Sequence, residues 1–393
     1  MSKIVFFCIP AHGHTNPTLG VVKELVSRGH QIFYYSYNIM REKIESAGAT
    51  FISCDDYDME KKLSIKNSTR VGNDLAFSTK LLVDTTLALD DKVCKEMTEL
   101  KPDCIVADSM ALWGKAVALK LGIPLISSTT TFAFNKHSAK IMKQGIGDLI
   151  KMLISLPKTT KQVNRLKDKG YPVRSILDII GNDDNTHTIV YTSPEFQPCS
   201  DTFSKKYTFV GPSIRSATEK IEKKCRKLIY ISMGTVNNNM VSFYKSCISA
   251  LRNTDYQVII SVGNIVSIKD FEELPENISI FSHVDQIAVL EKADVFISHC
   301  GMNSVSEILY FEVPLVMIPQ TSEQKGVSER VFQLGAGIKL DKTDAISISH
   351  AIDKILNNNS YKQNAKEISK TFKKCSGAKV AADKIIHLCN NPT

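Results

Sequence analysis

Long apolar runs, paired cysteines and short repeats are all missing from this sequence. No stretch reaches the roughly eighteen consecutive apolar residues that a membrane-spanning helix needs. The apolar run at residues 3–9 is short, and it leads into His-Gly-His instead of the small-residue cleavage site of a secretory signal. The ten cysteines contain no Cys-x-x-Cys pair, so we expect reduced thiols. These absences predict a cytoplasmic protein without a membrane anchor.

Positive charge is present but is not concentrated in one place. The net charge is +8, and its dispersal along the chain suits an anionic small ligand without predicting nucleic-acid binding. The charged stretches 60–62 and 222–227 are typical of solvated surfaces. No Gly-x-Gly-x-x-Gly follows the first strand expected in either half, which argues against a nicotinamide oxidoreductase.

Strand and helix patterns alternate through both halves of the chain. At 393 residues, with 43% hydrophobic and 23% charged residues, the sequence has the length and composition of a globular protein with two domains. A helix is expected to begin at Pro17 behind Asn16 as its cap and to end near Gly29. The expected strands are residues 3–9, 31–36, 103–108, 123–127, 188–192, 208–210, 228–232, 257–262, 278–281, 294–298 and 314–318. The alternation predicts an α/β fold with two doubly wound parallel sheets.

A change of composition separates the two halves. Residues 212–227 are charged and open with a Gly-Pro-Ser sequence, which is typical of an interdomain linker. We therefore expect an N-terminal domain at residues 1–211 and a C-terminal domain at 228–375. Residues 376–393 form an amphipathic pattern that predicts a final helix.

A strand, a turn and a helix are predicted in succession at residues 294–311. Such a junction directs the N–H groups and the positive dipole end of the helix toward the carboxyl end of the strand, where phosphate is favoured. Gly301 would let the backbone approach a ligand, and Glu307 would accept a hydrogen bond from a ribose hydroxyl. Alternatively, Gly301 serves only the turn, and Ser304-x-x-Glu307 is a helix capping box. The other polar side chains at this junction are His299, Asn303 and Ser304.

A longer stretch around this junction resembles a known signature. It begins with His283-Val284-Asp285-Gln286 and ends with Glu323-Gln324. Residues 283–324 as a whole resemble the donor-binding signature of the UDP-glycosyltransferase superfamily, and look closest to its bacterial macrolide glycosyltransferase branch. The resemblance implies the GT-B fold, in which two Rossmann-like domains face each other across a cleft. In such folds the last helix crosses back to the first domain.

The resemblance also implies which residues contact the nucleotide sugar. Glu323 and Gln324 resemble the acidic residue and glutamine that bind sugar hydroxyls, and that glutamine commonly accompanies glucose donors. The sequence departs from the family at His283, where relatives usually carry an aromatic residue that stacks on uracil, and at Asp285, where they carry proline. A thymidine diphosphate donor therefore remains open. The implied donor-binding residues are Thr235, His283, Val284, Gln286, His299, Gly301, Asn303, Ser304, Glu307, Glu323 and Gln324.

The sequence from Ile9 to Pro17 resembles the N-terminal motif of the same family. The family's catalytic base is the histidine three positions before the proline, which is His14 here. A histidine suits this task because its unperturbed pKa of about 6.5 lies near working pH. His12 is the competing candidate, and either histidine could simply cap the turn.

Asp108 ends a predicted strand of the same sheet. It resembles the family's aspartate that orients the base, and a carboxylate in that place stabilises the imidazolium. Capping of a helix that begins near Ser109 is the alternative role for Asp108. Phe132 and Phe134 are candidate contacts for an acceptor, with core packing as the alternative for each.

These features together predict an inverting, metal-independent glycosyltransferase that needs no cofactor. It would move glucose or another hexose from a UDP-sugar to a hydroxyl of a small hydrophobic acceptor, such as a macrolide, a flavonoid or another phenolic. We expect a monomer or a weak dimer. A GT-B nucleotide-sugar epimerase, which would not need His14 and Asp108, is one alternative. A non-catalytic nucleotide-sugar binding protein is the other.

Overall fold

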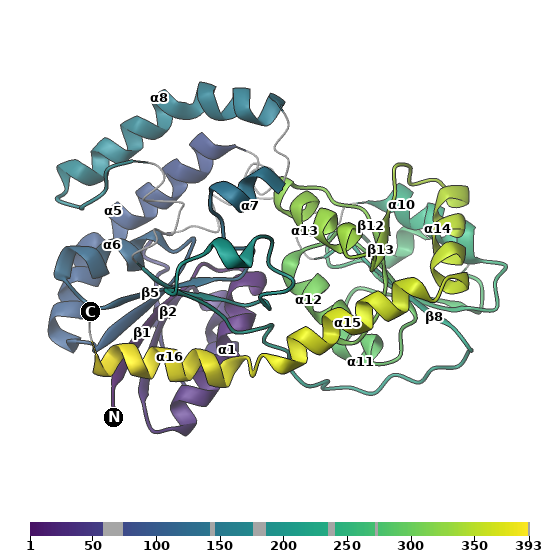
Figure 1. Ribbon diagram of the computed structural model, residues 1–393, viewed down its shortest axis with the longest axis horizontal. Helices are drawn as coiled ribbons and strands as arrows, with labels where there is room; N and C mark the ends of the chain where they lie inside the picture. The colour runs from purple at the N-terminus through teal and green to yellow at the C-terminus, as the bar shows by residue number, and fades with distance from the viewer. Residues whose placement is uncertain (58–73, 142–145, 176–185, 235–239, 272–273, 392–393) are drawn as a thin grey trace. The chain divides into compact units, whose positions relative to one another are not determined.

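The computed structural model describes residues 1–57, 74–141, 146–175, 186–234, 240–271 and 274–391 (Figure 1). The chain divides into two compact units. The first comprises Met1–Ser213 together with Cys375–Thr393, and the second comprises Ile214–Lys374. Among the described residues, no helix combines the length and the apolar character needed to cross a bilayer.

The first unit is built on a parallel sheet. Its described strands pair in the order β3-β2-β1-β4-β5-β6-β7. The strands are β1 (Lys3–Phe7), β2 (Gln31–Ser36), β3 (Thr50–Ser53), β4 (Cys104–Asp108), β5 (Leu125–Thr129), β6 (His187–Val190) and β7 (Tyr207–Phe209). The helices are α1 (His12–Ser27), α2 (Arg41–Glu45), α5 (Leu75–Leu100), α6 (Leu112–Leu121), α7 (Lys136–Ile141), α8 (Ile146–Asp168) and α16 (Ala378–Asn390), with short 3₁₀ turns at Asn38–Met40 and Ser200–Thr202.

Strand β1 shows why the apolar runs of this unit are continuous. Ile4 and Phe6 pack into the core on one face of the sheet, and Val5 and Phe7 pack into the core on the other. Successive side chains of a strand point to opposite faces, so a strand covered on both faces needs an apolar residue at every position.

Helix α16 packs in the first unit, although it lies at the end of the chain. It contacts α1 and β4, and its buried residues join the core around Phe6 (Figure 1). The thiol of Cys389 on α16 lies 2.8 Å from the thiol of Cys104 on β4. Burial of one apolar face therefore holds this helix against the first sheet.

The second unit repeats the same winding. Its described strands pair in the order β10-β9-β8-β11-β12-β13, again all parallel. The strands are β8 (Leu228–Ser232), β9 (Gln257–Ser261), β10 (Ile278–Phe281), β11 (Val295–Ser298), β12 (Leu315–Met317) and β13 (Gly337–Lys339). The helices are α10 (Val241–Leu251), α11 (Gln286–Leu290), α12 (Met302–Tyr310), α13 (Ser322–Gln333), α14 (Ala345–Asn357) and α15 (Ser360–Lys374), with a 3₁₀ turn at Ile268–Asp270.

Counted within its own unit, each sheet begins with the strand order 3-2-1-4-5-6. This order places a topological switch point between the first and fourth strands, where open α/β sheets bind ligands at the carboxyl ends of the strands. The structure confirms the predicted fold class of two doubly wound parallel sheets.

Several predicted element boundaries differ from the structure, and two of them lie next to the site described below. Helix α1 begins at His12 behind Ala11, so Pro17 lies inside the helix and Asn16 is not its cap. The amides of His14 and Thr15 already donate to the carbonyl of Ala11, which closes the first turn before the proline. Strand β5 begins after Pro124, which accepts a bond from Ile105 but has no N–H to donate, and it extends to Thr129.

Candidate active site and nucleotide-binding residues

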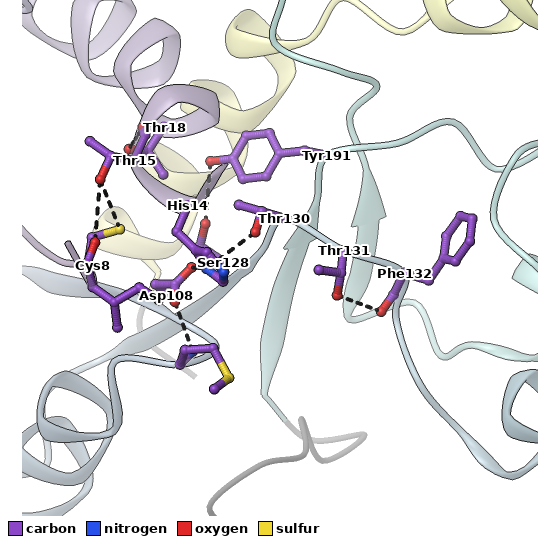
Figure 2. A network of polar contacts seen from close by, with 12 residues as sticks. Cys8, His14, Thr15, Thr18, Asp108, Ser128, Thr130, Thr131, Phe132 and Tyr191 are labelled. Atoms are coloured by element: carbon purple, nitrogen blue, oxygen red, sulfur yellow. Dashed lines mark hydrogen bonds and ion pairs between the residues drawn. The ribbon is translucent and has the colours of Figure 1, made fainter. Parts of the chain in front are cut away.

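The carboxyl ends of β1 and β4 bring His14 and Asp108 together (Figure 2). Asp108 is the last residue of β4, and His14 lies in the first turn of α1, which follows β1. Nδ1 of His14 lies 2.8 Å from Oδ2 of Asp108. The aspartate side chain is 1% exposed and the histidine side chain is 20% exposed. The structure therefore joins a buried carboxylate to a histidine that solvent reaches.

This contact determines what the histidine can do. A carboxylate only accepts hydrogen bonds, so the Nδ1–H of His14 donates to Asp108 and the lone pair is assigned to Nε2. The other oxygen of Asp108 accepts the amide of Met110 at 2.9 Å, which fixes the carboxylate. A histidine held in this tautomer can take a proton at Nε2, and the aspartate stabilises the resulting cation.

The two histidines of the N-terminal motif have different environments in the structure. His12 is exposed, and its Nδ1 lies 3.2 Å from Nζ of Lys43. His14, in contrast, contacts the carboxylate of Asp108. The capping alternative for Asp108 was wrong, because α6 begins at Leu112 with Ala111 as its cap residue.

Sequence reasoning missed a third residue beside the pair. The hydroxyl oxygen of Thr130 lies 3.4 Å from Nδ1 of His14, and Thr130 is 3% exposed (Figure 2). Asp108 pairs with Ser128 in the register between β4 and β5, so Thr130 lies just beyond the end of β5. Correct placement of β5 would have revealed Thr130, but the predicted strand ended at residue 127.

The two candidate acceptor residues have different environments. Phe132 is 1% exposed, and its ring centroid lies 5.4 Å from that of Phe196. Core packing therefore accounts for Phe132. Phe134 is 50% exposed and does not belong to the core.

In the second unit, α12 follows β11 after a short turn. The cap residue of α12 is Gly301, which makes no side-chain cap bond, and the amide of Val305 donates the first helical bond to its carbonyl. Asn303 and Ser304 lie half-buried in the first turn. The capping-box alternative for Ser304 was wrong. Glu307 instead accepts a hydrogen bond from Nε2 of Gln286 at 2.5 Å.

The imidazole of His299 lies between two glycines. A Cβ at Gly234 would stand 2.6 Å from its Cε1, and a Cβ at Gly301 would stand 2.7 Å from its Nε2. The space beside Gly301 is therefore taken up by this ring. Burial lowers the pKa of His299 to about 4, so the ring is neutral near pH 7. Its Nδ1 is buried and makes no hydrogen bond with the described residues.

The remaining donor-site candidates lie on or near α11 and α13. His283 is exposed and Val284 is buried, just before α11. Glu323 is exposed in the first turn of α13. The carboxamide oxygen of Gln324 accepts the amide of Gln320 at 2.8 Å and takes part in a capping box with Thr321. The carboxamide of Gln324 also carries two N–H donors, which a sugar hydroxyl could accept. Thr235 lies outside the described residues.

Comparisons with known proteins match a C-terminal region and the chain as a whole. A family described as "Erythromycin biosynthesis protein CIII-like, C-terminal domain" matches residues 245–385. The Bacillus subtilis (strain 168) protein named "Uncharacterized UDP-glucosyltransferase YojK" is 32% identical over 410 residues, which cover 100% of this chain and 99% of that protein. The Bacillus licheniformis "NDP-glycosyltransferase YjiC" is 33% identical over 394 residues, covering 97% of this chain and 96% of that protein.

A solved structure shows the same architecture. The glycotransferase of kitacinnamycin superposes with a TM-score of 0.83 at 23% identity, and the match covers 98% of each chain. The two parallel α/β sheets thus have the fold of GT-B glycosyltransferases. The chain belongs to the macrolide glycosyltransferase branch of the UDP-glycosyltransferase superfamily. It is a nucleotide-sugar glycosyltransferase that acts on small molecules.

Proposed function

We propose that this protein is an inverting glucosyltransferase that uses a UDP-hexose, with UDP-glucose as the first choice. The observation that carries the proposal is the contact between His14 and Asp108. A base with its second nitrogen held by a buried carboxylate is what removal of a proton from a neutral hydroxyl requires. We propose as its acceptor a small hydrophobic molecule with a hydroxyl group, such as a macrolide, a flavonoid or another phenolic.

The reaction follows from this arrangement as a single displacement. The acceptor hydroxyl gives its proton to Nε2 of His14 while its oxygen bonds to the anomeric carbon of the sugar. The bond from that carbon to the diphosphate oxygen breaks, and the diphosphate leaves with the electron pair. Attack opposite the leaving group inverts the configuration and gives a β-glycoside. Asp108 stabilises the imidazolium until its proton is lost to solvent, and a base of this kind contributes roughly 10²- to 10⁴-fold in rate.

The donor is assigned to the second unit. The N-terminus of α12 suits a diphosphate, because the peptide dipoles of a helix favour negative charge there. His299 would add a neutral hydrogen-bond donor, and Glu307 would accept from the ribose. We propose that these groups act without a divalent cation. Among the described residues, no three His, Cys, Asp or Glu side chains gather in a way that could hold a metal.

Mass spectrometry of transfer reactions tests this function. UDP-glucose, UDP-galactose, UDP-N-acetylglucosamine and thymidine diphosphate glucose would each be combined with a panel of macrolides and phenolics, with a metal chelator present throughout. We expect a hexosylated acceptor with UDP-glucose for the wild type and for His12→Ala, and none for His14→Ala. Product formation by His14→Ala at the wild-type rate would contradict the proposal.

A further inference from the structure

Asp285 is a buried carboxylate between two residues assigned to the donor site. It is 4% exposed, follows His283 and Val284, and directly precedes Gln286. Its Oδ1 accepts the amide of Ile287 at 3.1 Å, so it also caps the short helix α11.

The same carboxylate holds the segment that enters the second unit. Oδ1 forms an ion pair with Arg215. Oδ2 accepts the amide of Thr218 at 2.6 Å, its hydroxyl at 2.8 Å and the amide of Glu219 at 3.3 Å. Burial alone would raise the pKa of Asp285, but the bonds from Arg215 and Thr218 outweigh it and hold the pKa well below the usual range. The carboxylate is therefore charged near pH 7, and residues 215–219 are attached to the start of α11.

Gln286 anchors the same turn from its other side. Its side chain donates to Glu307 on α12, the residue assigned to the ribose. Burial raises the pKa of Glu307, while the bond from Gln286 and the charge of Arg215 both act against this rise. Two consecutive side chains thus fix residues 283–286, with Asp285 bonded to 215–219 and Gln286 bonded to α12.

The backbone of Asp285 has a conformation that its side-chain bonds hold in place. Its φ is −65°, which is the value that a proline ring imposes. Proline would restrain this turn through its ring, whereas Asp285 restrains it through charged hydrogen bonds. Because a charged hydrogen bond in a buried setting contributes more than a neutral one, five such contacts are a strong local restraint.

We propose that Asp285 is a positioning residue for the donor nucleotide, and that residues 215–219 complete this nucleotide site through it. Asp285 holds the backbone at 283–286 so that His283 meets the base and Gln286 keeps Glu307 in place for the ribose. This inference rests on the proposed function for the location of the nucleotide. It goes beyond the proposed function by naming what holds the nucleotide site rigid, which is the bonding of Asp285 to residues 215–219.

Calorimetric binding of UDP and of thymidine diphosphate to the full-length protein tests the inference, with Asp285→Asn as the variant. Asp294→Asn is a matched control. Asp294 also holds the entering segment, because it accepts bonds from Lys223 at 2.6 Å and from the amide of Leu228 at 2.9 Å. It precedes β11, and none of these bonds involves residues 283–286. Both variants lose charged bonds to that segment, so both should lower the unfolding temperature.

Of these two variants, we expect only Asp285→Asn to weaken nucleotide binding. The expected loss is about tenfold, which corresponds to one good hydrogen bond to a charged group. The loss should be equal for the two nucleotides, because Asp285 restrains the backbone. The KM for the sugar donor should rise by the same factor while kcat changes by less than about twofold. Arg215→Gln should weaken binding in the same direction, and adding it to Asp285→Asn should cause little further loss.

Two results would overturn the inference. One is wild-type nucleotide affinity in folded Asp285→Asn protein, and the other is an equal loss in Asp294→Asn. Because binding is measured without acceptor or turnover, the outcome is separate from the transfer assay. Weakened binding in Asp285→Asn would support the positioning role even if no acceptor were glycosylated. A wild-type protein that bound neither nucleotide would overturn both proposals.

Discussion

The topological switch points of the two sheets differ in charge: one carries an ionisable histidine–aspartate pair, and the other carries a neutral histidine between glycines. In the first unit, β1 and β4 lead to His14 and Asp108, an ionisable pair with a buried carboxylate. In the second unit, the corresponding strands β8 and β11 lead to Gly234 and His299, where the imidazole is packed between glycines and kept neutral. The strand order is the same, so the difference comes from the residues that follow the strands.

The proposed reaction accounts for this difference. The acceptor hydroxyl starts neutral. His14 becomes positively charged only while it holds the acceptor's proton, and the permanently charged carboxylate of Asp108 stabilises that cation. The diphosphate is negative throughout, so a second carboxylate near it would repel it. Neutral donors and a helix N-terminus serve it better. Four predictions test this contrast, in order of the size of the effect.

The largest effect is expected for His14→Ala. It should lower kcat for glycosyl transfer by roughly 10²- to 10⁴-fold, because it removes the base. Nucleotide affinity should be unchanged, since His14 belongs to the first unit. His12→Ala is the matched control and should change kcat by less than about twofold. A loss of UDP affinity in His14→Ala would break the division of labour between the units.

The second prediction concerns Gly301→Ala. The φ of Gly301 is −61°, so alanine causes no backbone strain, but its Cβ would lie 2.7 Å from Nε2 of His299. We expect a destabilisation of about 2 kcal/mol, as in other overpacked sites, together with weaker UDP binding. The double variant with His299→Ala should be less destabilised by the Gly301 change, measured by chemical denaturation. An additive loss would show that the ring does not occupy this space.

The third prediction follows from the low pKa of His299. In the unfolded chain His299 takes up a proton near pH 6.5, whereas in the folded protein it does so only near pH 4. The unfolded state therefore binds more protons in this range, and stability should fall as the pH drops from 6.5 to 4, by about 1 kcal/mol per pH unit from this residue. His299→Gln should show a shallower slope, while other titrating groups contribute equally to both proteins. Equal slopes would mean that His299 takes up its proton alike in the folded and unfolded states, so that folding does not lower its pKa.

The smallest effect is expected for Thr130→Val, which removes the hydroxyl beside His14 and keeps the side-chain shape. The contact is 3.4 Å long, so we expect kcat to fall only a few-fold with an unchanged KM for the donor. Thr131→Val, one position along and half-buried, serves as the control. A loss of kcat as large as that of His14→Ala would show that the Thr130 hydroxyl takes part directly in removal of the acceptor proton.

Much of the fold could be predicted from periodicity. The predicted strand at 228–232 coincides with β8, because a strand buried on both faces leaves a continuous apolar run with clear ends. The start of α1 could not be predicted in the same way. Pro17 is compatible with a first helical position, and nothing local shows that the turn closes earlier on Ala11.

The family resemblance implied the pairing of His14 with Asp108, and the sequence placed Asp108 at the end of a strand in the sheet whose first strand leads to His14. The structure brings the two side chains into contact. The environment of His299 could not be anticipated, since Gly234 lies 65 positions away in the sequence and its role depends on how the two turns pack. Gln324 shows the same limit. Its capping of α13 depends on the helix beginning at Ser322 behind Thr321, which the resemblance to a sugar-binding pair does not reveal.

The pH dependence of kcat/KM for wild-type and Asp108→Asn enzyme tests whether His14 and Asp108 act together to take the acceptor proton. We expect a rate that falls on the acid side as His14 becomes protonated. In Asp108→Asn the plateau should drop by on the order of 10²-fold and the acid limb should move to lower pH, because the carboxylate that stabilises the imidazolium is gone. Identical profiles for the two proteins would contradict the assignment of His14 and Asp108 as the unit that takes the acceptor proton.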